Sequence, residues 1–427
     1  MAPADVNRAI EAVWRIESAR LIAGLARIAG DVGVGEDLAQ EALVAALERW
    51  PESGVPDNPG AWLMATGKHR AIDRRRRAAV GERKVQELGR EIEARGGDEP
   101  GPDAAIDDPF DDDLLRLIFT TCHPLLSTDA RVALTLRLLG GLTNAEIARA
   151  SLASESTVAQ RIVRAKRTLT AAQVPFEAPA EDELSDRLAA VLEVIYLVFN
   201  EGYAASAGDE WVRPELVEEA LRLGRILAEL LPSEPEVHGL AALMELQASR
   251  IRARTGPNGD PVLLLDQDRA RWDWLLVGRG LAALERARRT NAAIGPYTLQ
   301  AAIAACHARA RRAEDTDWEQ IVALYDGLAA LTGSPIVALN RAVAVAMAFG
   351  PEPALEIVDA LSAEPALRDY HLLPTVRGDL LSRLGRDDEA RAEFEHAVAL
   401  TRNTRERAVL NERIAACGRG NGSRIVR

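Results

Sequence analysis

Threonine, glutamine and arginine side chains gather on one face of a predicted helix, where they could form hydrogen bonds with the edges of nucleic-acid bases and with phosphates. The helix is predicted over residues 155–169 because apolar residues recur there at helical spacing and form one buried stripe. That stripe consists of Val158, Ile162, Ala165 and Leu169. Residues 155–167 include four basic side chains and one acidic side chain, so the other face suits a phosphate-lined groove. The candidate nucleic-acid contacts are Thr157, Gln160, Arg161, Arg164 and Lys166.

A second, shorter helix and a turn must position this face. A glycine pair at residues 140–141 ends the preceding helix. Thr143, followed three residues later by Glu146, matches a capping box, so a helix of about two turns should begin near Asn144. Ser154 is placed to cap the helix that follows. The pattern predicts a helix-turn-helix with a recognition helix, and the alternative is an ordinary helical hairpin whose basic face is solvated.

Another basic stretch follows a loop with proline and glycine at residues 51–59. Asn58 can cap a helix there, with Pro59 in the first turn. Residues 68–77 of this helix include six basic side chains and one acidic side chain, and Trp62 lies near its start. Such a helix can bind single-stranded DNA, although a tryptophan in a first helical turn more often packs inward, and we favour that role for this ring. The candidate contacts are Asn58, Trp62, Lys68, Arg70, Arg74 and Arg75.

Two helices are predicted before this stretch, over residues 5–30 and 37–50, with a polar turn over residues 31–36 between them. On or beside the face opposite its apolar side, the second helix carries Asp37, Gln40 and Glu41. These residues could form a solvated surface or a surface that docks a partner. Spacing alone favours the solvated surface.

The composition predicts an all-α protein of two or three domains. The chain has 427 residues, strand-like alternation is nearly absent, and only 4% of residues are aromatic. The net charge of −13 argues against nonspecific coating of nucleic acid, so any contact with DNA would have to be local. The three cysteines lack the spacing of a metal site or a disulfide framework. No stretch has the apolar core of a signal peptide or a membrane span, so we expect a cytoplasmic protein.

In this order, the parts resemble the two-domain extracytoplasmic-function (ECF) group of bacterial sigma-70 factors, which direct RNA polymerase to promoters. The phrases EDLAQEALVAALERW and NPGAWLMATGKHRAIDRRRR look like region two of that group, and LTNAEIARASLASESTVAQRIVRAKRTL looks like region four. Residues 96–113 include eight acidic side chains, no basic one and three prolines, which predicts an acidic linker. The resemblance implies a region two domain over residues 1–77 and a region four domain over residues 114–173, with this linker between them over residues 78–113.

The resemblance also implies a role for each candidate set. The helix at residues 37–50 would bind core RNA polymerase, which reverses the preference for a solvated surface. Its contacts would be Asp37, Gln40, Glu41, Leu43 and Leu47. The loop at residues 51–58 and the helix at residues 62–77 would capture one strand of the minus-ten element of promoter DNA. The helix at residues 155–169 would read the minus-thirty-five element. Such a protein is not an enzyme and uses no cofactor or metal.

Residues 180–427 resemble the long helical extension, related to tetratricopeptide repeats, that one subgroup of ECF sigma factors carries. The phrases YLVFNEGY and DQDRARWDW are among those that look like this subgroup. A repeat-like pattern of small and aromatic residues consists of Gly378, Gly385, Ala390, Phe394 and Ala397. An earlier helix pair should turn at Gly350. Stacked helix pairs form binding surfaces, so the extension would regulate or support activity through a protein regulator or an intramolecular contact.

Two further groups of residues could suggest metal chemistry. Cys122–His123 and Cys306–His307 are sequence neighbours, whose side chains point about 100° apart on a helix and cannot bind one metal together. A group of carboxylates lies among arginines, which favours surface ion pairs over a metal site. These carboxylates are Asp266, Asp268, Asp273 and Glu285. Two other functions stay open, a helical-repeat scaffold or peptide-binding protein and a helix-turn-helix regulator that acts without polymerase.

Overall fold

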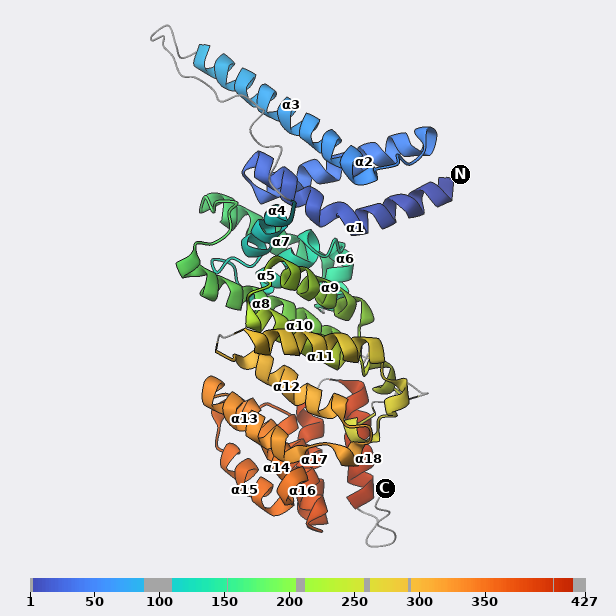
Figure 1. Cartoon of the computed structure of the whole chain (residues 1–427), viewed down its shortest axis with the longest axis vertical. Helices are drawn as coiled ribbons and strands as arrows, with labels where there is room; N and C mark the ends of the chain where they lie inside the picture. Colours follow the sequence, from blue (N-terminus) through green and yellow to red (C-terminus); the bar gives the residue numbers. More distant parts are fainter. Residues whose placement is uncertain are drawn as a thin grey trace. The chain divides into compact units, whose positions relative to one another are not determined.

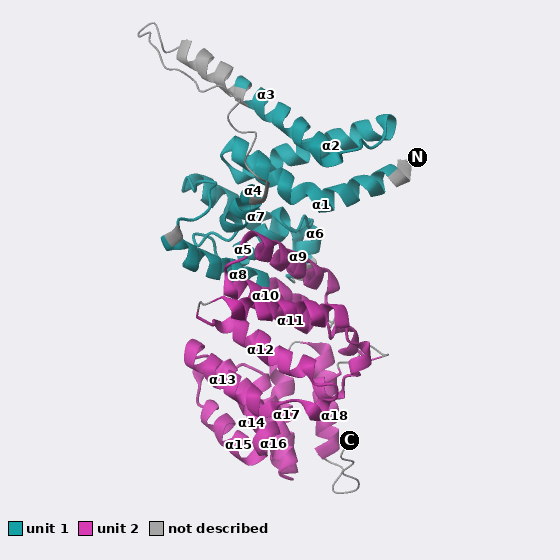
Figure 2. Ribbon diagram, viewed as in Figure 1, with its two compact units in different colours: residues 1–195 teal, residues 196–427 magenta. Residues whose placement is uncertain are grey.

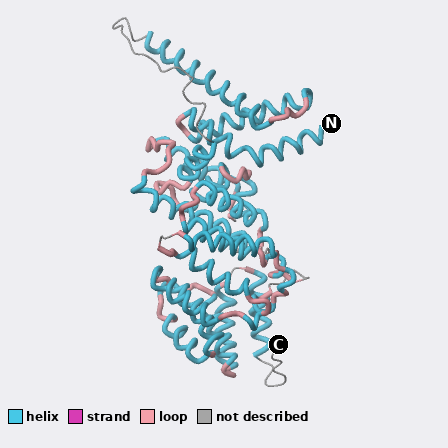
Figure 3. The backbone as a smooth tube through the Cα atoms, in the orientation of Figure 1, coloured by secondary structure: helices cyan, strands magenta, loops and turns pink. Residues whose placement is uncertain are grey.

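A computed structural model describes residues 3–87, 110–151, 153–204, 212–256, 262–290, 293–401 and 403–417. Every regular element in these residues is a helix, which confirms the prediction of an all-α protein (Figure 1, Figure 3). None of the helices in this part of the chain is both long and apolar enough to cross a membrane. The chain divides into two compact units, residues 1–195 and 196–427, and the division falls within helix α8 (Glu181–Tyr203) (Figure 2).

Unit 1 holds the predicted polymerase-binding and DNA-binding segments. Its helices before α8 are α1 (Pro3–Ala29), α2 (Val32–Ser53), α3 (Pro59–Glu87), α4 (Phe110–Thr121), α5 (Thr128–Leu138), α6 (Asn144–Ala150) and α7 (Glu155–Ala171). Helices α1, α2 and α3 pack on one another. Helices α5, α6 and α7 also pack together, and α4 joins the two groups because it contacts both α1 and α5.

Helix α2 begins at Val32, so the prediction of a turn over residues 31–36 is wrong. The side chain of Asp31 accepts a hydrogen bond from the backbone N–H of Val34 at 2.9 Å and caps the helix. Gly35, which suggested a turn, instead lets α2 approach α1 closely. A Cβ atom at this position would lie 2.6 Å from the backbone nitrogen of Ala26. The glycine is therefore a packing residue within a helix.

Two other boundaries differ from the sequence prediction. Helix α3 continues to Glu87, beyond the predicted end at residue 77. Helix α4 begins at Phe110, inside the predicted acidic linker. Its Asp113 is buried because the carboxylate accepts hydrogen bonds from Arg27 at 2.9 Å and from Arg116 at 3.0 Å. The rest of that linker, residues 88–109, lies outside the described residues.

Unit 2 is a series of helices that pack mostly on their chain neighbours. Its α-helices after α8 are α9 (Pro214–Leu230), α10 (Pro235–Ala248), α11 (Trp274–Arg289), α12 (Pro296–Arg309), α13 (Trp318–Thr332), α14 (Pro335–Phe349), α15 (Pro351–Leu361), α16 (Leu372–Arg383), α17 (Asp387–Leu400) and α18 (Thr404–Cys417). Short 3₁₀ turns η1 (Ile251–Ala253), η2 (Leu264–Asp266) and η3 (Arg269–Arg271) separate α10 from α11.

The repeat-like pattern near the end of the chain forms a helix pair, as predicted. Gly385 turns the chain between α16 and α17 with a φ of 74°, and Gly350 does the same between α14 and α15 with a φ of 101°. Ala390, Phe394 and Ala397 are all buried. A Cβ atom on Gly378 would lie 2.7 Å from the ring of Phe394, so only glycine fits at this contact.

Candidate nucleic-acid interface

The helix-turn-helix forms from local caps that the sequence predicts. The backbone N–H of Thr143 donates to the carboxylate of Glu146 at 2.7 Å, and the N–H of Glu146 donates to the Thr143 hydroxyl at 3.2 Å. This reciprocal pair starts α6 at Asn144. The hydroxyl of Ser154 accepts a hydrogen bond from the N–H of Thr157 at 3.1 Å and starts α7. Both predicted helix starts are confirmed.

The outer face of α7 presents polar side chains to solvent. The predicted stripe beneath it is buried, which fixes the rotation of the helix about its axis. Thr157, Gln160 and Arg164 are exposed. The guanidinium of Arg161 is half-buried and forms an ion pair with Asp129 at 3.0 Å. A cavity of about 390 Å³ lies between these residues and the segment at residues 125–130. This face therefore offers hydrogen-bond donors and acceptors beside a hollow.

Lys166 lies apart from the other four candidates on α7. Its ammonium group forms an ion pair with Glu36 of α2. The Glu36 side chain is buried, and its carboxylate also accepts hydrogen bonds from Arg137 at 2.9 Å and from Gln40 at 2.8 Å. In this conformation Lys166 joins α7 to α2 and does not point with Arg164.

The exposed face of α2 combines acidic and apolar side chains. Asp37 and Glu41 are exposed, and Leu47 is 44% exposed. Val44, at 49% exposure, belongs to the same face, although it is not among the residues expected from the sequence. Val44 lies three residues after Glu41 and three residues before Leu47, and this helical spacing could have placed it on the same face. The other two candidates on this helix, Gln40 and Leu43, are half-buried.

Helix α3 starts as predicted, because the side chain of Asn58 accepts a hydrogen bond from the N–H of Ala61 at 3.0 Å. The ring of Trp62 is half-buried and packs edge-on against buried Trp50, with 5.3 Å between the ring centroids. This packing confirms the inward role that the sequence favoured for the ring. The candidate cations of this helix lie as follows: Lys68 and Arg74 are exposed, Arg70 pairs with Glu41 of α2 at 3.1 Å, and the Arg75 side chain lies outside the described residues.

The carboxylates considered for a metal site have other roles. Asp268 accepts from the N–H of Ala270 and caps η3, and Asp273 caps α11 in the same way. Glu285 forms an ion pair with Arg289 at 3.2 Å, and within the described residues none of the four carboxylates pairs with Arg269, Arg271 or Arg286. The prediction of surface ion pairs was wrong for the two aspartates, because each precedes a helix whose first N–H groups need acceptors. No group of three potential metal ligands lies together in the part of the chain that the structure describes.

Both Cys–His pairs sit in packed surroundings. Burial raises the pKa of the Cys122 thiol, which lies 3.5 Å from the hydroxyl of Thr135. The Cys306 thiol donates to Gln320 at 3.1 Å. Burial, together with nearby arginine charge, lowers the pKa of His307 to about 4, and its ring packs edge-on against Trp318. Cys122, Cys306 and His307 therefore each contact neighbouring side chains within the chain.

Family models match three segments of the chain. The model described as Sigma-70 region 2 matches residues 16–80, and the model described as Sigma-70, region 4 matches residues 116–169. A family of unknown function (DUF6596) matches residues 187–288, which begin within α8 and end within α11.

One curated relative matches most of this chain, and two others match less than half of it. The uncharacterized protein R00370 of Rhizobium meliloti is 44% identical over 392 residues, which is 90% of each chain. The probable ECF RNA polymerase sigma factor SigI of Mycobacterium tuberculosis is 28% identical over 169 residues, 39% of this chain and 56% of its own length. The ECF RNA polymerase sigma factor SigK of Mycobacterium bovis is 30% identical over 150 residues, 34% of this chain and 74% of its own length. No solved structure matches this chain significantly.

Proposed function

Because this chain belongs to the ECF group of sigma-70 RNA polymerase sigma factors, we propose that it directs core RNA polymerase to specific promoters and stabilises the melted DNA there. The observation that carries the proposal is the outer face of α7. Local caps and a buried apolar stripe hold this helix so that Thr157, Gln160 and Arg164 face solvent. Side chains of these types form hydrogen bonds with base edges and phosphates in the major groove.

We assign duplex recognition of the minus-thirty-five element to this face. Arg164 is exposed and has no ion pair among the described residues, so it is available to DNA without rearrangement. Arg161 must leave Asp129 before it can contact a phosphate or a base. Lys166 would join the set only after its pair with Glu36 opens.

Helix α3 would capture a strand of the minus-ten element. Exposed Lys68 and Arg74 supply cations along the helix, in line with electrostatic capture of single-stranded DNA. Asn58 would contribute by holding the first turn of α3, since its side chain already accepts a hydrogen bond from Ala61. Trp62 would support the site by packing against Trp50.

The exposed face of α2 would bind core RNA polymerase. Val44 and Leu47 offer apolar area, and acidic Asp37 and Glu41 flank them. The ion pair between Glu41 and Arg70 joins this face to the strand-binding helix α3. Unit 2 would regulate or support activity, through a protein regulator or through contacts within the chain.

A pull-down with bacterial core RNA polymerase tests the proposal. The Gln40→Ala, Glu41→Ala variant should bind the polymerase more weakly than the wild type. A matched control is Asn7→Ala, Glu11→Ala, which removes one amide and one carboxylate from the exposed side of α1. Equal binding by both variants would refute the assignment of the α2 face. If the wild type fails to bind polymerase at all, the scaffold interpretation would replace the sigma factor mechanism.

An in vitro transcription assay can separate promoter recognition from polymerase binding. A promoter is first selected by sequencing the transcripts that core polymerase and the wild-type protein make from genomic fragments. Arg164→Ala should then lower the transcript from that promoter while polymerase binding stays unchanged. A polymerase-independent regulator would instead bind duplex DNA equally well with and without core polymerase and would produce no transcript.

A further inference from the structure

Unit 2 contains a basic stretch, in addition to the two basic helices of unit 1. Residues 250–312 include twelve arginines, no lysine and five acidic residues, a formal net charge of +7. The whole chain carries −13. This stretch therefore opposes the net charge of the chain and favours an anionic partner.

Some of these arginines are structural. The guanidinium of Arg254 donates to the carbonyl of Tyr203 at 2.6 Å and lies 3.6 Å from the centroid of its ring. Arg269 donates to the carbonyl of Ala310 at 2.7 Å and lies over the ring of Trp272. Both are buried, so they hold the 3₁₀ turns against the neighbouring helices. Seven others are exposed and have no ion pair within the described residues: Arg252, Arg271, Arg279, Arg286, Arg288, Arg309 and Arg311.

The outer face of α11 places part of this charge next to exposed apolar groups. Helix α11 packs on α10 with its inner side. On its outer side, Trp274 is 52% exposed and Leu275 is 65% exposed. Arg279 and Arg286 follow Leu275 at helical spacings of four and eleven residues and lie on the same side. The result is a stripe that is apolar at one end and cationic along the rest.

Gly278 keeps this outer face flat. A Cβ atom there would meet no atom within 4 Å, so packing within the chain does not require a glycine. Glycine inside a helix costs about 1 kcal/mol relative to alanine. Its presence on an exposed face between Trp274 and Arg279 suits the close approach of another backbone.

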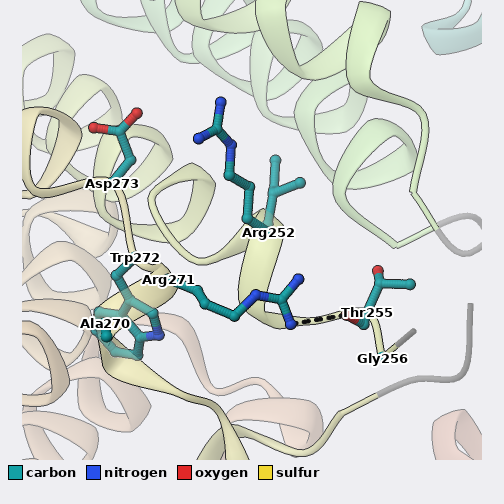
Figure 4. A pocket seen from close by; sticks show the side chains of 8 residues that line it. Arg252, Thr255, Gly256, Ala270, Arg271, Trp272 and Asp273 are labelled. Atoms are coloured by element: carbon teal, nitrogen blue, oxygen red, sulfur yellow. Dashed lines mark hydrogen bonds between the residues drawn. The ribbon is translucent and has the colours of Figure 1, made fainter.

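A cavity of about 600 Å³ lies at the start of the same helix (Figure 4). Its lining includes Arg252, Arg271 and Asp273. The carboxylate of Asp273 accepts hydrogen bonds from the N–H groups of Leu275 and Leu276, so it is engaged as a helix cap. Arg271 donates to the carbonyl of Thr255 at 3.3 Å, as the dashed line in Figure 4 marks. Neither guanidinium of the cavity is paired with a carboxylate in the described residues.

We propose that the outer face of α11, together with this cavity, binds an acidic amphipathic helix of another protein. Apolar side chains of that helix would cover Trp274 and Leu275, and its carboxylates would pair with Arg279 and Arg286 and with Arg252 in the cavity. Tryptophan and arginine are the residue types that contribute most to binding at protein interfaces. Duplex DNA would satisfy the arginines but would leave the exposed tryptophan and leucine without an apolar cover. The observations therefore favour an acidic protein segment over nucleic acid.

Fluorescence anisotropy with the full-length protein tests this inference, which concerns unit 2 and does not depend on the function proposed for unit 1. The probe is a labelled helical peptide of about 18 residues with leucine on one side and glutamate on the other. The control probe carries glutamine in place of every glutamate. We expect the glutamate peptide to bind more tightly than the control. The Arg279→Glu, Arg286→Glu variant should weaken binding by about tenfold or more, since each reversal turns an attraction into a repulsion.

Two further variants complete the test. Trp274→Ala should also weaken binding, because it removes the apolar anchor. Arg15→Glu, Arg20→Glu makes the same change in charge at exposed positions of α1 and should leave binding unchanged. Circular dichroism melting checks that each variant folds. If the charge reversal unfolds the chain, Arg279→Gln, Arg286→Gln replaces it.

Several results would overturn the inference. One is no binding of the glutamate peptide at about 1 mM, and another is equal binding of the glutamine peptide. An equal loss of peptide binding in the Arg15→Glu, Arg20→Glu variant would mean that binding depends only on the net charge of the protein. If duplex DNA binds more tightly than the peptide and its binding depends on the same arginines, the face binds polyanions in general and not an acidic helix. If the wild type dimerises and Trp274→Ala abolishes the dimer, the face binds a second copy of this chain.

Discussion

Replacing Glu36 by alanine should loosen the contact between α2 and the helices α5 and α7. The Glu36 side chain is 4% exposed and pairs with Arg137 at 2.9 Å and with Lys166. Removing one partner of a buried ion pair costs about 3–5 kcal/mol. Arg137 and Lys166 are 25% and 21% exposed, so water can partly solvate them after the change. We therefore expect a loss of about 2 kcal/mol, below that range.

Hydrogen exchange measured by mass spectrometry on the full-length protein can detect this loss locally. A decrease of 2 kcal/mol in the free energy of opening corresponds to about 30-fold faster amide exchange. The effect should appear in peptides from α2, α5 and α7, and peptides from α17 should exchange as in the wild type. Glu48→Ala is the matched control, because Glu48 lies on the same helix, is exposed and has no ion pair in the described residues.

A double-mutant cycle decides whether Lys166 acts through Glu36. Lys166→Ala and Glu36→Ala should each speed exchange, and the double variant should be less affected than the sum of the two. Unchanged exchange in α5 and α7 after Glu36→Ala would refute the reasoning, because the buried pair would then contribute nothing. Lys166 would in that case be available to DNA in the way that the sequence first suggested.

Three further predictions concern stability, and each can be checked by urea unfolding. Ser154→Ala removes the cap of α7 and should cost about 1 kcal/mol, whereas Ser154→Asp should keep the stability; equal losses would exclude capping. Burial and neighbouring arginines lower the pKa of His307 to about 4, so the unfolded chain gains a proton between pH 6.5 and 4 that the folded chain does not. The free energy of unfolding should therefore fall by up to about 3 kcal/mol as the pH decreases from 6.5 to 4, and His307→Gln should reduce this pH dependence. Gly378→Ala should cost about 1–3 kcal/mol because its Cβ atom would meet the ring of Phe394, and a neutral result would mean that the ring moves freely.

Features that depend on neighbouring residues in the sequence could be predicted. The caps at Thr143, Ser154 and Asn58 lie within a few residues of the N–H groups they bind, so residue type and spacing identified three helix starts. The buried stripe of α7 followed from periodicity for the same reason. Once this buried side of the helix is known, Thr157 and Gln160 must lie on the exposed side, as they do.

Features that depend on distant residues could not be predicted. Glu36 and Lys166 are far apart in sequence, and no spacing indicates that their side chains meet. The helical start of α2 was missed because Gly35 reads as a turn signal until its contact with Ala26 is known. Asp113 looked like part of a charged linker because its partner Arg27 lies 86 residues away. Ion pairs that join separate helices need the fold before they can be assigned.

On the outer face of α7, Asp129 already serves as a counterion for Arg161, because the two side chains form an ion pair. Each phosphate that a free cation neutralises releases a small ion from DNA, and this release steepens the dependence of binding on salt by nearly one unit per contact. Arg164, which has no such partner among the described residues, should contribute fully to that dependence. In the proposed complex, Arg161 would exchange one anion for another, and the freed Asp129 would leave a negative charge close to the DNA. If α7 binds DNA as proposed, Asp129 would therefore lower the salt sensitivity of the complex at the expense of affinity, although it is not among the residues expected to contact DNA.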